Sequence, residues 1–504
     1  MLRSNLDNAN FSSNRNALHA VGKVFRDRRL WLVAALLAFQ AAWTASPVDS
    51  AQTLSAQLEA VIKRELPPNF EISMQVTDLQ SGRVLMEKNP DLPLVPASTM
   101  KVATSAAALQ VLHPDFVFVT EVLVDSQRGA SAGNIYLRGS GDPYLVTEEL
   151  FRLTRSVKDQ GLDEIRGNII VDDSYFIPGK PLDENEKLGP RAYHAPYSAL
   201  SLNFNSIKIV VHPGPKPGDP AIVMTDPVSE YTTLKGTVKT TSGNKPLQMD
   251  ITKELTGDDR EIINVEGTIG VQAPAKGRYV NVAVPDIYTG EVFKEFLLRE
   301  GIRVAGKVVR GKVPGSAVSW VEFPSRPLSI IVYGLNKFSN NFMAEQISLA
   351  MGAHVYGAPG TREKGLAVVR KHLLSCGVDE GSFSLSEASG LSRNNRLSAS
   401  ALVRVLMQGA RDFSYNSEYL ASFGVAGIDG TLKEKFTDAG ARRRLRAKTG
   451  TLKGITALTG YGMSIDHKPF VFALLINSMH KGTGLIDYGD KIMRAVLDMP
   501  FGTR

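Results

Sequence analysis

The sequence predicts a multidomain α+β protein in which the two ends of the chain build one helix–sheet–helix unit around a β-rich insertion. With 504 residues the chain is too long for a single hydrophobic core. Helical and strand-like patterns mix before residue 118 and again after about residue 290, whereas short strand-like pieces and turns dominate between them. A hydrophobic content of 43% and a charged content of 22% are ordinary for a soluble globular protein.

The first fifty residues have the composition of an export signal. Residues 1–29 are polar and basic, residues 30–45 are almost wholly apolar, and Pro47 follows. This order is typical of a secretory signal peptide, although the candidate cleavage site near Ser50 is irregular. The apolar stretch is slightly short for a membrane span of about 20 residues. We therefore expect residues 1–50 to be a signal peptide, with an N-terminal anchor as the alternative, and the protein to reside in the periplasm or cell envelope.

The charge and the cysteine content exclude several classes of protein. The formal net charge is +7, of which residues 1–29 contribute +4 through six basic and two acidic side chains, leaving +3 for the rest. This remainder is too small to favour nucleic-acid binding. The single cysteine, Cys376, excludes an intramolecular disulfide, and the eight histidines form no metal-binding motif. We expect no metal and no other cofactor.

The spacing of apolar residues predicts most elements of the helix–sheet–helix unit. Near the N-terminus we expect a helix over 53–66, two strands around a turn over 72–89 and a buried helix after Pro96. In the C-terminal third we expect a strand over 328–336, a helix over 340–357, an antiparallel hairpin of 444–464 with 468–478, and an amphipathic helix over 485–499.

Ser98 and Lys101 form a Ser-x-x-Lys motif at the start of the predicted buried helix. The same spacing occurs at 242–245 and 478–481, but only Ser98 opens a long apolar helix. Residues three apart share a helical face, so the Lys101 amine can reach the Ser98 hydroxyl. Burial and the positive helix end favour a neutral lysine, which can accept the hydroxyl proton and activate the serine. The alternative is a helix-capping serine beside a solvated lysine.

Two further motifs carry polar groups suited to the same chemistry. Lys448-Thr449-Gly450 lies on a strand of the predicted hairpin, where backbone N–H groups can face a substrate. Ser339-x-Asn341 lies between a predicted strand and a predicted helix. Taken singly, the first motif could be an exposed basic strand with a glycine bulge, and the second could be a helix cap.

Together the three motifs are far more specific than any one of them. Ser-x-x-Lys, Ser-x-Asn and Lys-Thr-Gly in this order are the signature of penicillin-binding proteins and class A β-lactamases. The chain resembles the S13 family of D-alanyl-D-alanine carboxypeptidases, the class C low-molecular-mass penicillin-binding proteins. Three further stretches support this narrower family: 139–145 (GSGDPYL), 193–207 (YHAPYSALSLNFNSI) and 387–398 (EASGLSRNNRLS). Ala388 stands where the family often has glycine, a departure that leaves the chemistry intact.

The resemblance implies a penicillin-binding-protein or β-lactamase-like transpeptidase domain, an antiparallel sheet flanked by helices, with two nested β-rich inserted domains. The 238 positions between Lys101 and Ser339 leave room for such insertions, unlike those of a compact β-lactamase. The implied boundaries are 51–118 with 318–504 for the serine D,D-peptidase domain, 119–211 with 276–317 for inserted domain II, and 212–275 for inserted domain III.

The resemblance further implies a serine D,D-peptidase that acts on peptidoglycan peptides and is inhibited by β-lactams. It would be a carboxypeptidase, an endopeptidase on cross-links, or both. Ser98 would attack the carbonyl of the penultimate D-Ala, with Lys101 as general base. Ser339 and Asn341 would relay a proton to the leaving amine and hold the catalytic lysine or the substrate amide.

Substrate binding is implied for a second group of residues. Lys448 and Thr449 would bind the terminal carboxylate, and Gly450 would leave room for a substrate along the strand. The backbone N–H groups of Ser98 and Thr451 would form the oxyanion hole. Asp142 and Arg393 would clamp the amino and carboxylate groups of a meso-diaminopimelate side chain. The alternative for these two is an Asp-Pro turn and a surface ion pair.

Two competing functions fit the motifs less well. A β-lactamase or esterase would deacylate fast, but the long insertion and the lack of an evident deacylating glutamate near Ser339 disfavour it. A vestigial wall-binding scaffold is disfavoured because Ser98, Lys101, Ser339, Asn341 and Lys448 are intact. The sequence is compatible with a peripheral membrane contact and with any oligomeric state.

Overall fold

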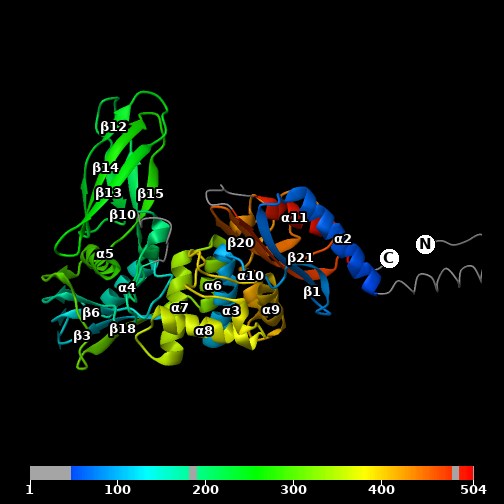
Figure 1. Cartoon of the computed structure of the whole chain (residues 1–504). Coiled ribbons are helices and arrows are strands. Elements are labelled where there is room, and N and C mark those ends of the chain that lie inside the picture. Colours follow the sequence, from blue (N-terminus) through cyan, green and yellow to red (C-terminus); the bar gives the residue numbers. More distant parts are fainter. Residues whose placement is uncertain (1–46, 181–189, 480–486, 503–504) are drawn as a thin grey trace, which may run out of the picture.

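The computed structural model of the protein describes residues 47–180, 190–479 and 487–502. Figure 1 shows a body of helices and one large sheet, and beside it a β-rich part from which a narrow arm rises. Segments from both ends of the chain form the body, and the middle of the chain forms the second part. The predicted α+β fold, with a β-rich insertion between the two halves of one unit, is confirmed.

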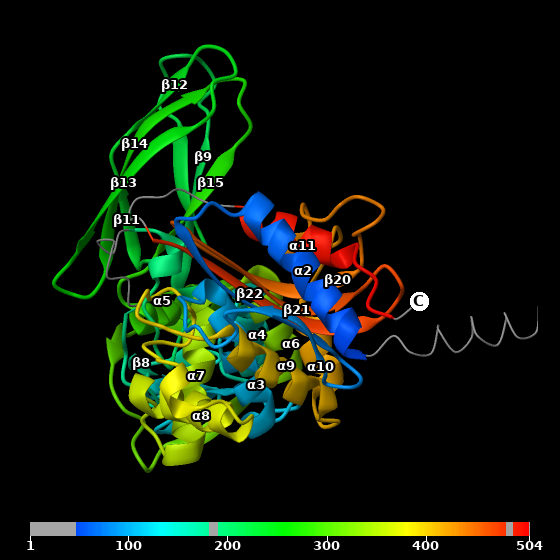
Figure 2. The ribbon, with the colours of Figure 1, turned by 45° about the vertical axis from the view of Figure 1, so that its right-hand side comes forward.

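A six-stranded antiparallel sheet joins the two ends of the chain. Across the sheet the order is β19 (Gly424–Val425), β20 (Leu445–Leu452), β21 (Ile455–Met463), β22 (Pro469–Ser478), β1 (Phe70–Asp78) and β2 (Val84–Lys88). β1 pairs with β22 along its whole length, from Phe70 opposite Ser478 to Asp78 opposite Phe470. Helices α2 (Pro47–Glu65) and α11 (Tyr488–Leu497) cover one face (Figure 2), where their apolar side chains share a core with the strands.

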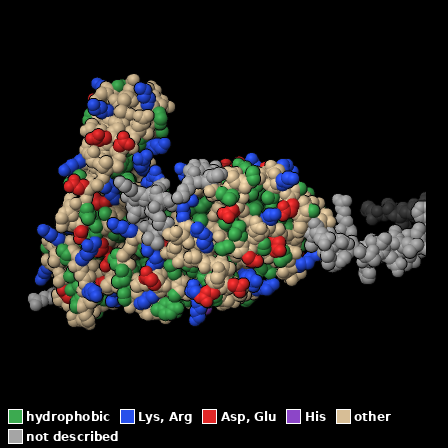
Figure 3. All heavy atoms as spheres, in the orientation of Figure 1, with side chains coloured by type: hydrophobic (Ala, Val, Ile, Leu, Met, Phe, Trp, Pro, Cys, Tyr) green, Lys and Arg blue, Asp and Glu red, His purple; other side chains and the backbone are tan. Residues whose placement is uncertain are grey.

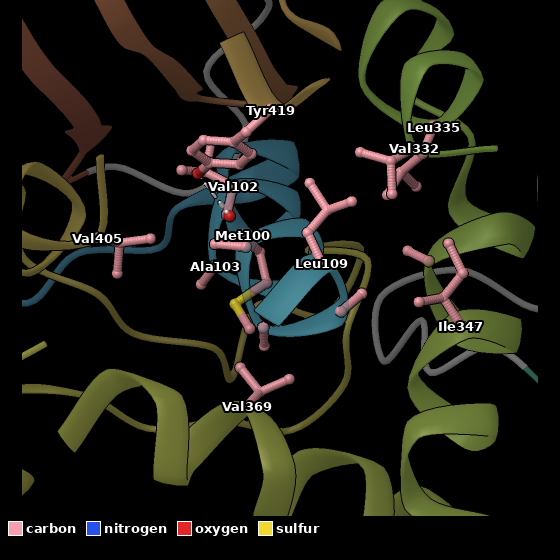
Figure 4. Packing of buried hydrophobic residues seen from close by; sticks show 14 of the residues in the cluster. Met100, Val102, Ala103, Leu109, Val332, Leu335, Ile347, Val369, Val405 and Tyr419 are labelled. Carbon is pink, nitrogen blue, oxygen red and sulfur yellow. Dashed lines mark hydrogen bonds between the residues drawn. The ribbon is translucent and has the colours of Figure 1, made fainter. Parts of the chain in front are cut away.

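The other face of the sheet carries the helical layer, built around α3 (Met100–Leu112). The surrounding helices are α6 (Leu328–Phe338), α7 (Asn341–Tyr356), α8 (Arg362–Ser375), α9 (Ala399–Arg411) and α10 (Asn416–Ser422). Figure 4 shows apolar side chains of these helices closing around α3. The Tyr419 hydroxyl donates to the Val102 carbonyl at 2.9 Å, which ties α10 to α3. The first turn of α3 is therefore held rigidly inside the body.

Within the described residues the inserted part contains four smaller sheets and two long helices. The part next to the body consists of β3 (Val119–Val124), β4 (Gln127–Arg128), β5 (Ser131–Ala132), β6 (Ile135–Arg138), α4 (Thr147–Asp159), β7 (Glu164–Ile165), β8 (Ile169–Asp172), α5 (Pro285–Arg299), β16 (Arg303–Val304), β17 (Val308–Arg310) and β18 (Val318–Pro324). The arm consists of β9 (Ser206–His212), β10 (Ile222–Asp226), β11 (Thr232–Lys235), β12 (Val238–Thr241), β13 (Gln248–Leu255), β14 (Glu261–Gly270) and β15 (Lys276–Asn281).

Most buried apolar residues of the inserted part, from Val122 to Val321, form a cluster of their own, whereas Phe176, Tyr197 and Ala199 belong to the cluster of the body. This separation supports the division into a peptidase domain and inserted domains, whose exact boundaries stay a prediction. β18 pairs with β3 and so completes the sheet of the inserted part before the chain returns to the body. On the face seen in Figure 3, basic and acidic side chains are interspersed over both parts.

The prediction of a strand over 328–336 is wrong, because this segment forms α6. Leu328, Ile331, Val332 and Leu335 are buried, whereas Ile330 is 46% exposed. These buried positions follow the i, i+3, i+4, i+7 spacing of one helical face. The β-branched residues of the segment obscured that period. The Ser-x-Asn motif consequently joins two helices.

The predicted single strand over 444–464 is also wrong, because the segment folds back on itself. β20 and β21 pair antiparallel from Leu445 opposite Gly462 to Leu452 opposite Ile455. The reversal falls at Lys453 and Gly454, and Gly454 has a φ of 74°, a value that favours glycine. The predicted hairpin with 468–478 exists, but it is formed by β21 and β22.

The predicted signal or anchor lies mainly outside the described residues, since only Pro47 to Ser50 are placed, at the start of α2. Among the helices of the described chain, none has the length and apolarity needed to cross a membrane.

Candidate active site

Ser98 lies in a short 3₁₀ turn, Ala97–Thr99, that leads directly into α3. Ala97 has a φ of 46°, in the left-handed region that non-glycine residues seldom adopt. Both the hydroxyl and the N–H of Thr99 donate to the Pro96 carbonyl, at 2.7 and 3.2 Å. The Ser98 side chain does not cap the helix. The capping alternative is therefore wrong, and a strained turn of this kind is typical of functional sites.

Lys101 occupies the next turn, and its side chain is fully buried. Its Nζ lies 3.2 Å from Ser98 Oγ, 2.7 Å from Asn341 Oδ1 and 2.5 Å from the Ser389 carbonyl oxygen. Burial lowers the pKa of Lys101 to about 8, while the charges of Glu387 and Glu345 act in the opposite direction.

These three contacts determine what a neutral Lys101 can do. A neutral amine keeps two N–H bonds and one lone pair. Asn341 Oδ1 and the Ser389 carbonyl are acceptors only, so they hold the two N–H bonds. The lone pair then faces Ser98 Oγ, which is the arrangement that a general base for this hydroxyl requires.

Ser339 and Asn341 lie at the junction of α6 and α7. Asn340 caps α7 by accepting a hydrogen bond from the Met343 N–H at 3.1 Å, so the capping alternative for Ser339 is wrong. Ser339 itself adopts a left-handed conformation, with φ 58° and ψ 40°. Its hydroxyl accepts a hydrogen bond from Lys448 Nζ at 2.7 Å.

Lys448 is the second fully buried lysine of the site. Its Nζ also donates to the Thr449 carbonyl at 2.7 Å. Burial lowers the pKa of Lys448 well below its usual range, and the nearby charge of Lys101 lowers it further. The Thr449 hydroxyl donates to the Thr431 hydroxyl at 2.8 Å. Sequence reasoning missed Thr431, which belongs to no motif.

The Lys-Thr-Gly segment lies on β20 next to an open sheet edge. β19 pairs with β20 only at Ala447 and Arg446, and no other described strand covers that edge from Lys448 onward. Such an edge can receive an extended peptide as an added strand. A side chain on Gly450 would approach the Pro96 carbonyl to 2.8 Å. Glycine is thus needed here for the Ser98 turn itself, a reason that the sequence did not indicate.

The structure does not join Asp142 to Arg393. Asp142 is buried, accepts the Tyr144 N–H at 2.7 Å, and has its pKa raised to about 7 by burial. The Arg393 guanidinium donates to the Lys453 carbonyl at 2.7 Å, at the turn that follows β20. Among the described residues no hydrogen bond or ion pair links these two side chains, so the predicted clamp is not preformed.

Sequence reasoning used the stretch 387–398 only as evidence for the family and missed that its loop 387–392 supplies the Ser389 carbonyl to Lys101. Gly390 has a φ of 83°, and a Cβ there would lie 1.9 Å from the Ala97 carbonyl oxygen. Glu345, on α7, accepts the Ala388 and Ser389 N–H groups of this loop at 3.0 and 2.9 Å. The expectation that no evident deacylating glutamate lies near Ser339 stays a prediction, but the contact of Glu345 with this loop was missed. Glu345 lies four residues after Asn341 on the same helix, and this spacing could have indicated that its side chain lies beside the site.

A cavity of about 670 Å³ opens beside the Ser-x-Asn junction. The lining of this cavity includes residues of both parts of the molecule. The body contributes Ser339 and Asn341, and the arm contributes Lys208, Asp226 and Tyr279. The space next to the reactive groups is thus shared between the body and the inserted part.

Comparison with known proteins gives consistent matches along almost the whole described chain. The model of the D-Ala-D-Ala carboxypeptidase 3 (S13) family matches residues 54–495. A D-alanyl-D-alanine carboxypeptidase of Actinomadura sp. (strain R39) is 31% identical over 459 residues, which cover 87% of this chain and 83% of that protein. The D-alanyl-D-alanine carboxypeptidase DacB of Haemophilus influenzae is 25% identical over 448 residues, which cover 86% of this chain and 90% of that protein.

The fold has a matching crystal structure, penicillin-binding protein 4 from Haemophilus influenzae. The TM-score is 0.72 at 22% sequence identity, over 87% of this chain and 97% of that one. The same protein in complex with a β-lactam matches with a TM-score of 0.70. The predicted penicillin-binding-protein fold is thereby confirmed.

Replacing Gly390 tests the contact between loop 387–392 and the Ser98 turn. Gly390→Ala should lower the free energy of unfolding by at least about 1–2 kcal/mol, because alanine is strained at this φ and its Cβ would meet the Ala97 carbonyl. Gly381→Ala is the matched control, since a Cβ there meets no atom within 4 Å. Thermal unfolding of both variants checks this, and equal midpoints would contradict the contact.

Proposed function

The chain belongs to the S13 family of D-Ala-D-Ala carboxypeptidases, and on that premise we propose a role for each residue of its site in an acyl-enzyme mechanism. The enzyme is a serine-type carboxypeptidase, and its substrates are peptidoglycan peptides that end in D-Ala-D-Ala. The observation that carries the proposal is the environment of Lys101, whose two fixed acceptors leave its lone pair for Ser98.

Acylation begins when Ser98 Oγ attacks the carbonyl carbon of the penultimate D-Ala. The hydroxyl proton passes to Lys101 Nζ as the new C–O bond forms. The carbonyl oxygen becomes an oxyanion, which the backbone N–H groups of Ser98 and Thr451 stabilise. Thr451 lies on the open edge of β20, so its strand can hold the peptide beside the nucleophile.

Collapse of this intermediate breaks the peptide bond. Ser339 gives its hydroxyl proton to the leaving nitrogen and is reprotonated by Lys448, which lies 2.7 Å away. The terminal carboxylate binds at Lys448 and Thr449, and its charge raises the pKa of the buried Lys448 amine so that the ammonium form is favoured. Lys101 then loses its proton to solvent and Lys448 takes one up, so Lys101 is neutral again. Neutral Lys101 accepts a proton from the water that attacks the acyl carbon and passes it to Ser98 Oγ as the acyl bond breaks, which releases the shortened peptide.

The chemistry serves two substrates with the same acyl group. A leaving D-Ala makes the enzyme a carboxypeptidase, and a leaving cross-linked peptide makes it an endopeptidase. The cavity of about 670 Å³ beside Ser339 supports a substrate larger than a dipeptide end. β-Lactams react at Ser98 as stable analogues of the D-Ala-D-Ala end.

Asp142 and Arg393 recognise a charged side chain on the substrate. The Asp142 carboxyl offers a buried acceptor for an amino group, and Arg393 offers a guanidinium for a carboxylate. Because no bond links the two in the described structure, the substrate itself, with both groups on its diaminopimelate side chain, would complete the clamp.

The protein acts outside the cytoplasm, in the periplasm or cell envelope. The composition of residues 1–50 and the location of peptidoglycan support this placement. A peripheral membrane contact is compatible with it.

Labelling with benzylpenicillin tests the nucleophile. Intact mass should show one covalent adduct on the wild type and none on Ser98→Ala, because the acyl bond needs Ser98 Oγ. Ser242→Ala, which removes the serine of another Ser-x-x-Lys sequence at an exposed position, should be labelled like the wild type. A folded Ser98→Ala protein that is still labelled would move the nucleophile elsewhere. Consumption of penicillin without an adduct would indicate a β-lactamase. The absence of both an adduct and consumption would indicate a scaffold.

The rate of acylation should depend on pH through Lys101. The base works only when neutral, and the pKa of Lys101 is lowered to about 8, so the neutral fraction rises as pH increases through that value. The second-order rate constant for benzylpenicillin should therefore increase about tenfold per unit between pH 6 and 7 and level off above about 8. Stopped-flow or quenched mass measurements give this profile. A flat profile would show that another group is the base.

The clamp predicts a selective loss for diaminopimelate substrates. Arg393→Ala and Asp142→Asn should each lower kcat/KM about tenfold or more for a peptide with a free diaminopimelate amino and carboxylate group, because a charged hydrogen bond is lost. A diacetyl-lysyl-D-Ala-D-Ala peptide lacks both groups and is the control substrate, on which the variants should resemble the wild type. Equal losses on both peptides would contradict the clamp.

A further inference from the structure

Two buried glutamates, Glu345 and Glu387, lie behind the catalytic lysine and have no role in the steps above. Glu345 is one helical turn beyond Asn341 on α7, and Glu387 begins the loop 387–392. Both side chains are buried, with 6% and 2% of their residue surfaces exposed. Buried acidic residues are rare unless they are paired or fully hydrogen-bonded.

The two carboxyl groups meet at one backbone nitrogen. The Ser389 N–H lies 2.9 Å from Glu345 Oε1 and 2.8 Å from Glu387 Oε2. The two carboxyl groups are therefore close neighbours in a buried site. Two ionised carboxylates this close in a buried site would repel each other, so the pair is more stable with one proton between them.

The hydrogen bonds around each group show which one carries the proton. Glu387 Oε1 accepts from the Gly390 N–H at 2.6 Å and from Asn395 Nδ2 at 2.6 Å, and Oε2 accepts from the Ser389 N–H and hydroxyl. This set of donors stabilises an ionised carboxylate. Within the described parts of the chain, the donors to Glu345 are two adjacent N–H groups of the loop. Burial and the charge of Glu387 raise the pKa of Glu345 well above its usual range.

We propose that Glu345, protonated, and Glu387, ionised, share one proton and act as the positioning pair of the catalytic lysine. The pair fixes the loop 387–392 so that the Ser389 carbonyl accepts a hydrogen bond from Lys101 Nζ at 2.5 Å. That contact holds one of the two N–H bonds of neutral Lys101 and so directs its lone pair to Ser98. The inference rests on the proposed function in one respect, since acylation of Ser98 is its readout.

The single charge matters as much as the geometry. Lys101, Arg362 and Tyr197 are the titratable or cationic groups that face the pair from the surrounding elements. One negative charge partly offsets the cost of burying the Lys101 ammonium. Two negative charges would favour the ammonium more strongly and reduce the neutral amine that attacks the Ser98 proton.

The matched variants Glu345→Gln and Glu387→Gln test this assignment. A glutamine at 345 imitates a protonated carboxyl, because it keeps an acceptor for the loop N–H groups and a donor toward Glu387. Its acylation rate with benzylpenicillin should be close to that of the wild type, with the same pH midpoint. A glutamine at 387 places an NH₂ group against donors and removes the charge. Its acylation rate should fall about tenfold or more.

Glu345→Leu separates positioning from simple burial. Leucine offers neither donor nor acceptor, so acylation should fall as in Glu387→Gln, and Glu345→Gln should rescue it. Thermal unfolding reports whether each variant is folded. If Glu387→Gln or Glu345→Leu does not fold, the pH profile of Glu345→Gln alone still decides the assignment.

Two results would overturn the proposal. A pH midpoint of Glu345→Gln that is lower by about 1 unit would mean that the wild-type pair carries two charges, because removal of a negative charge lowers the pKa of Lys101. Equal losses in the two glutamine variants would mean that the carboxyls are interchangeable structural acceptors. Failure of the proposed function is distinguishable from both, since it appears in Ser98→Ala with the pair intact.

Discussion

The rest of the site depends on the burial of one lysine amine. An ammonium group removed from water costs several kcal/mol unless it is surrounded by acceptors. Lys101 Nζ finds acceptors on three separate segments: the Ser98 turn, the start of α7 and the loop 387–392. The acceptors keep the amine in one place, and burial lowers its pKa to about 8, near the pH at which a base is useful.

This requirement explains why the body is made from both ends of the chain. The Ser98 turn belongs to the N-terminal segment, whereas Asn341 and Ser389 come after the insertion. The pairing of β1 with β22 and the enclosure of α3 by later helices hold these segments together. The insertion can be long because it leaves after α3 and its last strand, β18, pairs with its first strand, β3. The two strands return the chain to the place where it left.

Much of this could be predicted from the sequence, because motifs with fixed local spacing carry it. Ser98 and Lys101 share a helical face, and Lys448 lies on a strand, as the pattern indicated. The segment 328–336 was mistaken because its β-branched residues obscured a helical period. The Ser389 carbonyl and the glutamate pair were missed for another reason. Their roles arise from contacts between segments far apart in sequence, and a backbone carbonyl has no sequence signal at all.

The same geometry bears on how the acyl-enzyme is hydrolysed. A class A β-lactamase uses a separate glutamate to activate the deacylating water. Here Glu345 and Glu387, the two carboxyl groups behind Lys101, are buried and bonded to the loop 387–392. Their oxygens accept hydrogen bonds from N–H groups of this loop, which disfavours either carboxyl as the base for the water. In the proposed mechanism Lys101 is therefore the base in both half-reactions, a role that its contact with Ser98 Oγ and its lowered pKa support.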